Sequence, residues 1–184
     1  PGMRIPAPVY AGAVHTQDLH APLSTPEMVI FTTKVLARNA ERIAALHRDA
    51  DGMEVEVVDV DLVYNEFSSG APDISGLRKY LKMLYDRGAE AGKPLRYALL
   101  LGRATLDHKG LVTTTASAYT TLPWWVVRND RQSLIETDAY GTDDFLAMLE
   151  DGQGTSLGID KLSIAVGRMP MTDADDIPSS KGVL

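Results

Sequence analysis

The sequence predicts an α/β fold, a three-layer sandwich in which a mostly parallel sheet of about four strands is flanked by helices. Short apolar runs rich in Val, Ile and Leu occur at 28–32, 55–60, 97–102 and 162–167. Such runs are typical of strands that are buried on both faces. Segments with apolar residues at helical spacing separate the first three runs. Because strands joined through a helix run parallel with a right-handed crossover, these units indicate a parallel sheet.

The chain divides into three parts by composition. Residues 1–26 are rich in proline and show little periodicity, which predicts an irregular lead-in or linker. Residues 27–171 hold the α/β unit. Residues 172–184 resemble the truncated start of a further segment, in which Thr172 caps a helix that Pro178 interrupts.

The first helix is expected directly after the first strand. Its apolar residues recur at helical spacing, and Thr32 or Thr33 can cap its N-terminus. Asp51 and Gly52 are expected to end it, since glycine is favoured just beyond a helix C-terminus.

The second helix is expected to begin after Asp73, which is a plausible N-terminal cap, and to end near Gly88. One stripe carries leucines and tyrosines. The charged residues Arg78, Lys79, Lys82 and Asp86 lie opposite this stripe.

The third strand, 97–102, is the most hydrophobic run and should be central. Residues 103–141 are less regular and are predicted to form an elaborated loop beyond its carboxyl end, where open α/β sheets place function. Short strands at 112–115 and 124–127 are expected within this loop. Residues 142–149 are predicted to form a short helical turn or strand.

Charge and composition exclude several classes of protein. The 184 residues carry 18 Lys and Arg against 25 Asp and Glu, a formal net charge of −7. This balance argues against nucleic acid as a partner and against an anionic membrane surface, and no apolar run is long enough for membrane insertion. The chain has no cysteine. Disulfides, cysteine-ligated metals and a thiol nucleophile are therefore excluded within it.

The sequence contains neither the motif of a serine hydrolase nor a nucleotide-binding motif. His15 and His20 lie in the lead-in, His47 lies near a helix C-terminus, and His108 lies in the elaborated loop. No Gly-x-Ser-x-Gly segment occurs, which argues against a serine hydrolase. Neither Gly-x-Gly-x-x-Gly nor a Walker motif follows a strand, so a nucleotide-binding flavodoxin-like domain remains an unfavoured hypothesis.

Acidic residues are dense near the end of the elaborated loop, and they raise the question of a metal site. They are Asp138, Asp143, Asp144, Glu150 and Asp151, with Asp107 as a further candidate. The EF-hand spacing is absent. We therefore predict a capped turn with solvent-exposed acids, and assign no metal ligand and no cofactor.

Two further features are open to alternative interpretations. Trp124 and Trp125 can form a binding platform, or one can pack on the sheet while the other covers a loop. Arg168, at the end of the fourth strand, can contact a substrate anion. Alternatively, it can bind loop carbonyls or pair with Asp143 or Asp144.

Several segments together resemble the gingipain-type cysteine peptidases. They are Asn-Glu-Phe-Ser-Ser-Gly and its continuation at 65–74, the helical segment 78–87, Leu-Leu-Leu-Gly at 99–102, Asp-His-Lys at 107–109, Tyr-Gly-Thr-Asp-Asp-Phe at 140–145 and Ile-Ala-Val-Gly-Arg-Met-Pro at 164–170. The resemblance extends from about Val29 to Pro170. Within the family, the chain is most similar to members that process proteins secreted by the type IX secretion system.

The resemblance implies a caspase-like catalytic region built from two α/β subdomains, of which this chain is the first. In the family the catalytic His and Cys lie downstream, in the second subdomain, so no catalytic residue is assigned here. His108 does not match the family's catalytic His. The family usually has Gly-Asp after the central strand, whereas this chain has Gly102-Arg103.

The resemblance also implies partners and a location. The expected partners are the downstream catalytic subdomain of the same parent chain and secreted protein substrates. The expected location is extracytoplasmic, at the cell surface or associated with the outer membrane. On this interpretation the chain alone is inactive. The alternative is a stand-alone α/β module that binds a protein or a glycan.

Overall fold

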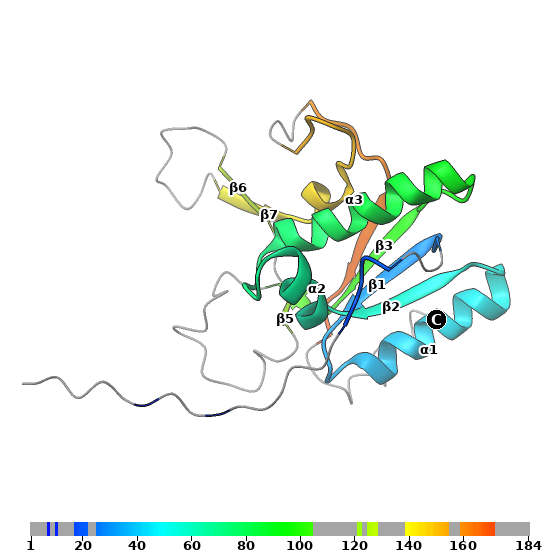
Figure 1. Cartoon of the computed structure of the whole chain (residues 1–184), viewed down its shortest axis with the longest axis horizontal. Helices are drawn as coiled ribbons and strands as arrows, with labels where there is room; N and C mark the ends of the chain where they lie inside the picture. The colour runs from blue at the N-terminus through cyan, green and yellow to red at the C-terminus, as the bar shows by residue number, and fades with distance from the viewer. Residues whose placement is uncertain are drawn as a thin grey trace, which may run out of the picture.

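A parallel sheet of four strands, in the order β2-β1-β3-β8, forms the centre of the molecule (Figure 1). The computed structural model describes residues 7, 10, 17–21, 25–104, 121–122, 125–128, 139–154 and 159–171. The sheet strands are β1 Met28–Thr32, β2 Val55–Asp59, β3 Tyr97–Leu101 and β8 Ala165–Met169. The predicted parallel α/β fold is confirmed.

Helices cover both faces of this sheet. They are α1 Ala37–Asp51, α2 Val60–Phe67, α3 Ile74–Ala91 and the 3-10 helix η3 Asp144–Ala147. Because side chains alternate along a strand, Val29 and Phe31 of β1 join the apolar cluster with α2, α3 and η3, whereas Met28 and Ile30 join the cluster with α1. The three predicted layers are therefore present, with α1 on one face and α2 and α3 on the other (Figure 1).

The inner position of β3 agrees with its sequence. It pairs with β1 on one side and with β8 on the other, and Leu100 and Leu101 are fully buried. The fourth strand begins later than the predicted 162–167. Ser163 donates its N–H to the Ala147 carbonyl (2.7 Å), so pairing with β3 starts only at Ala165.

Two of the predicted helix ends are confirmed. The Asp73 carboxylate accepts a hydrogen bond from the Ser75 N–H (2.8 Å) and caps α3. Gly52 ends α1 in the left-handed conformation, with φ of 66°. The threonine cap of α1 is wrong, because the N-cap residue is Leu36 and no side chain caps this end. Thr32 is buried at the end of β1 and its hydroxyl donates to the Thr33 carbonyl instead.

The predicted end of α3 near Gly88 is also wrong, since the helix continues to Ala91 and Gly92 ends it with φ of 70°. Gly88 has a different role. A Cβ there would lie 2.4 Å from the Lys93 carbonyl oxygen, so the glycine allows the chain after α3 to pass close to the helix.

The second strand is one residue shorter than predicted, because α2 begins directly after it. Asp59 caps this helix by accepting the Asp61 N–H (3.0 Å). Residues 62–67, for which the sequence predicts no element, lie inside α2.

The region 103–141 contributes two small sheets beyond β3. Strands β4 Arg103–Ala104 and β5 Thr121–Leu122 pair in parallel, and β6 Trp125–Arg128 and β7 Ala139–Thr142 pair antiparallel. Figure 1 shows β5, β6 and β7 on the side toward which the central strands run. The short strand predicted at 124–127 corresponds to β6, whereas 112–115 and 172–184 lie outside the described residues.

None of the helices in the described part of the chain combines the length and hydropathy needed to cross a membrane.

Candidate functional site at the carboxyl edge of the sheet

The carboxyl ends of the four parallel strands lie at one edge of the sheet, as they must in any parallel arrangement. Asp59 ends β2, and Gly102 follows β3. Strand β4 starts from this same edge. In open α/β folds this edge is where ligands and substrates bind.

An ion pair connects the edge strand β8 to the loop before η3. The Arg168 guanidinium donates to both carboxylate oxygens of Asp143, from Nε to Oδ2 at 2.9 Å and from Nη2 to Oδ1 at 2.7 Å. Its Nη1 donates to the Gly102 carbonyl at 3.1 Å. The side chains are only 11% and 19% exposed. A bidentate, largely buried pair holds its two elements in one geometry.

This geometry decides between the alternatives for Arg168. It pairs with Asp143 and binds a loop carbonyl, as one of the predicted alternatives stated. Asp144 makes a different contact from Asp143. Its backbone N–H donates to the Thr142 hydroxyl (3.1 Å), and its side chain is exposed. The Arg168–Asp143 pair therefore organises the edge of the sheet.

The buried Tyr64 is affected by the charge of Arg168. Burial raises the pKa of the Tyr64 hydroxyl well above its ordinary value, and the positive charge of Arg168 opposes that rise. Tyr64 is therefore neutral at physiological pH. Asp59, at the end of β2, has a raised pKa because of burial, with the Asp61 N–H bond acting in the opposite direction.

A second arginine, Arg78, which the sequence places opposite the apolar stripe of α3, binds two backbone carbonyls of a distant segment. Its Nε donates to the Met148 carbonyl (2.9 Å) and its Nη2 donates to the Gln153 carbonyl (2.9 Å). The guanidinium also lies 5.2 Å from the centre of the Phe145 ring. Burial lowers the pKa of Arg78. No local sequence signal identifies this role, because its partners lie about seventy positions away.

The acidic residues weighed as metal ligands have separate partners. Asp143 binds Arg168. Glu150 accepts from the Tyr85 hydroxyl (2.7 Å), and Asp151, with a side chain 97% exposed, pairs with Lys82. Asp107 and Asp138 lie outside the described residues, as do Trp124 and the side chain of Trp125.

The described histidines form no nucleophile–base pair with a serine. His47 hydrogen-bonds Asp51 (2.7 Å) in the last turn of α1, beside a cavity of about 450 Å³ at the amino edge of the sheet. His20 hydrogen-bonds Glu66 (2.9 Å). His15 and His108 lie outside the described residues. In the part of the chain that the structure describes, no hydrogen bond joins a histidine to a serine or threonine hydroxyl.

Among the residues that the structure describes, one group of potential metal ligands converges. Asp18, His20 and Glu66 place their ligand atoms within 4.8 Å of one another. Both oxygens of Glu66 already accept hydrogen bonds from protein donors. The group is explained by these bonds, so we assign no metal to it.

Comparison with known proteins finds a matching family model and similar solved structures. The model of peptidase family C25, the gingipain family, matches residues 21–179. A solved structure, that of dimeric latent PorU from Porphyromonas gingivalis, is similar with a TM-score of 0.77 and 27% sequence identity. The match covers 94% of this chain and 16% of the PorU chain. No curated protein matches.

The parallel α/β fold and the family match agree with each other. They also agree with the resemblance that the sequence predicts from the motifs at 65–74 and 164–170. The chain belongs to peptidase family C25, the gingipain family of cysteine peptidases.

Proposed function

We propose that this chain is the first, non-catalytic α/β subdomain of a PorU-like cysteine peptidase that processes proteins secreted by the type IX system. The observation that carries the proposal is a family match over residues 21–179 in a chain that has no cysteine. A cysteine peptidase needs a thiolate nucleophile, so the reacting sulfur belongs to other polypeptide.

The partner of this subdomain is a following His/Cys subdomain of the same parent chain. The match to only 16% of the PorU chain agrees with a part of a larger protein. In that protein the thiolate attacks a substrate carbonyl carbon, and the amine leaves with a proton from the His. Water or another amine then cleaves the thioester and restores the thiol. This chain contributes structure to the cleft and no reacting atom.

The incompletely covered face of the sheet supports this partnership. A helix is about 10 Å wide and strands lie about 4.8 Å apart, so one helix covers about two strands. Helix α1 packs on β1 and β2. On the same face, Tyr97, Leu99 and Met169 are only partly buried, and Ala165 and Gly167 are exposed. A following subdomain that packs against β3 and β8 would cover this apolar strip.

The carboxyl edge of the sheet is the part of this chain that forms one side of the proposed substrate cleft. Arg168 and Arg78 hold the segment around η3 from two sides, through Asp143 and through the Met148 carbonyl. A rigid edge positions the small sheets of 103–141 beside the following subdomain. By the family resemblance, the protein acts outside the cytoplasm, at the cell surface or outer membrane.

The decisive experiment compares this chain with the parent chain extended through the next subdomain. Peptide hydrolysis that iodoacetamide abolishes is expected only in the extended protein. Addition of the separately produced following subdomain should restore activity. Thiol-dependent hydrolysis by the 184-residue chain alone would contradict the proposal. A parent reading frame without a downstream Cys and His would favour a stand-alone protein- or glycan-binding module instead.

A further inference from the structure

Residues 17–21 contact helices α2 and α3 although they lie more than forty positions away in the sequence. The anchor is the Glu66 carboxylate near the end of α2. It accepts the Leu19 N–H on both oxygens (3.0 and 2.9 Å), the Gln17 side-chain amide (2.7 Å) and the His20 Nδ1 (2.9 Å). Gln17 also donates to the Leu62 carbonyl (2.7 Å).

Two further side chains complete the contact. The His20 ring stacks on the Phe67 ring, with centroids 4.5 Å apart and planes at 15°. Arg87 of α3 donates to the His20 carbonyl at 2.7 Å and to the Ala21 carbonyl at 3.4 Å. Leu19 packs against the apolar cluster of α2 and α3. The segment is thus held through its backbone, its polar side chains and one apolar side chain.

We propose that Glu66, Phe67 and Arg87 form a built-in peptide-binding site whose ligand is the chain's own segment 17–21, here called the strap. The site recognises a short polar segment by capturing one backbone N–H with a carboxylate and two backbone carbonyls with a guanidinium. Both are charge-assisted hydrogen bonds, which are stronger than neutral ones. The strap fixes where the preceding polypeptide reaches this subdomain.

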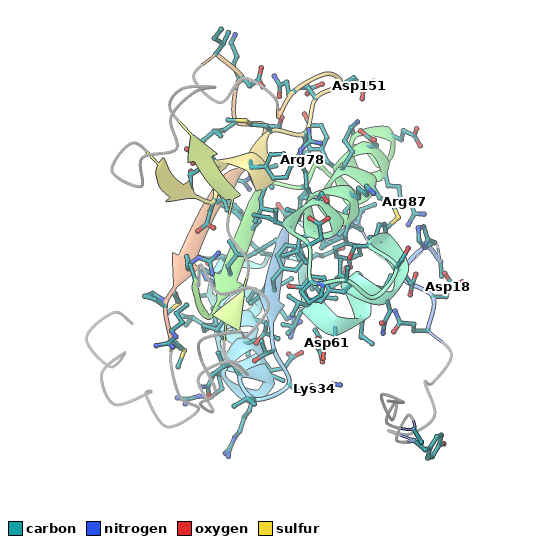
Figure 2. The ribbon with its side chains drawn as sticks, turned by 90° about the vertical axis from the view of Figure 1, so that its left-hand side faces the viewer. Asp18, Lys34, Asp61, Arg78, Arg87 and Asp151 are labelled. Carbon is teal, nitrogen blue, oxygen red and sulfur yellow. The ribbon has the colours of Figure 1, made fainter. Side chains whose placement is uncertain are left out.

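The strap lies on the side of the molecule opposite the edge strand β8. Figure 2 shows Asp18 and Arg87 together on one side of the molecule, with the edge strand β8 on the other. Residues 17–21 are therefore held on the side of the molecule opposite β8, and they do not themselves cover the strip formed by Tyr97, Leu99 and Met169.

The test is hydrogen exchange on the chain itself, which does not depend on peptidase activity. In Glu66→Gln, the side-chain NH₂ group is a hydrogen-bond donor that faces the donors of Leu19 and His20. The peptide-binding site therefore loses hydrogen-bond acceptors while the side-chain volume stays the same. The Leu19 amide should exchange at least about tenfold faster than in the wild type, a change of about 1.4 kcal/mol in local opening. Arg87→Met should give a smaller acceleration. Amides of Ile30 and Leu100 should remain protected, which shows that the fold is intact.

Glu90→Gln is the matched control, because Glu90 is an exposed residue of α3 and the same charge is removed. It should leave Leu19 exchange unchanged. An unprotected Leu19 amide in the wild type, or unchanged protection in Glu66→Gln, would overturn the proposal. Saturable Zn²⁺ binding that is lost in His20→Ala would also overturn it, in favour of a metal site at Asp18, His20 and Glu66.

Discussion

Arg168 and Asp143 are the pair on which the carboxyl edge depends most directly. Because both side chains are largely buried, removing one charge leaves the other without compensation. We expect Asp143→Asn to lower the free energy of unfolding by about 2–3 kcal/mol, somewhat less than for a fully buried pair. Urea unfolding of the variant and the wild type measures this difference.

Lys82 and Asp86 supply the matched comparison at the same residue scale. This pair is also close, at 2.6 Å, but Asp86 is half exposed and the two residues are neighbours on one helix. Asp86→Asn should cost less than about 1 kcal/mol, since water and salt screen an exposed pair. Equal losses in the two variants would show that burial does not determine the strength of the Arg168–Asp143 pair.

Glu66 makes the stability of the strap depend on pH. Burial disfavours its charge, but hydrogen bonds from Leu19, Gln17 and His20 outweigh burial and hold its pKa below the ordinary value of 4.5. The ionised carboxylate therefore stabilises the folded protein above that value, and the stabilisation is lost as pH falls through the lowered pKa.

Wild type should consequently exceed Glu66→Gln in stability at neutral pH and have a smaller advantage at an acidic pH below the ordinary value of 4.5. The charged or titratable groups around Glu66 are Asp18, His20, Tyr80 and Arg87. Urea unfolding at both pH values is the measurement. A stability difference that grows on acidification would contradict the assignment.

At the scale of elements, α3 illustrates how a close approach overrides helix propensity. Ala is favoured over Gly inside a helix by about 1 kcal/mol. A Cβ at position 88 would nevertheless lie 2.4 Å from the Lys93 carbonyl oxygen. We expect Gly88→Ala to destabilise the protein by about 1–3 kcal/mol, because the connection to β3 must shift. Thermal unfolding should show a lower Tm.

Gly167→Ala serves as the control for that substitution. A Cβ on Gly167 meets nothing within 4 Å, so the variant should stay within about 0.5 kcal/mol of wild type. If both variants keep wild-type stability, the steric account of Gly88 is incorrect.

Local patterns predicted elements well where the pattern and the surroundings agreed. Asp73 caps α3 and Gly52 ends α1, as their residue types indicated. The predictions failed at Thr32, which is buried at the end of a strand, and at Gly88, which packs against the following loop. In both cases a contact with another part of the chain replaced the local preference.

At the scale of the whole molecule, the incompletely covered face of β3 and β8 predicts association of the isolated chain. Tyr97, Leu99 and Met169 present an apolar strip that water contacts, and such strips mark interaction surfaces. We expect the chain alone to self-associate with increasing concentration in analytical ultracentrifugation. Leu99→Lys should reduce this association.

Leu46→Lys is the matched variant, because Leu46 is an exposed leucine of α1 and the added charge is the same. It should leave the association unchanged. A chain that stays monomeric at all concentrations and binds no hydrophobic dye would count against a covering subdomain.

The sequence by itself determined the apolar runs that become β1, β2 and β3, the two helix ends at Asp73 and Gly52, the likeness to gingipains and the lack of a thiol. These properties depend on residues that are close in the chain or on composition. Only the tertiary structure decided that Arg78 binds the Met148 carbonyl, seventy positions away, and that Glu66 binds the strap. Such contacts form because crossover connections bring distant segments together, and no local spacing encodes which side chains then meet.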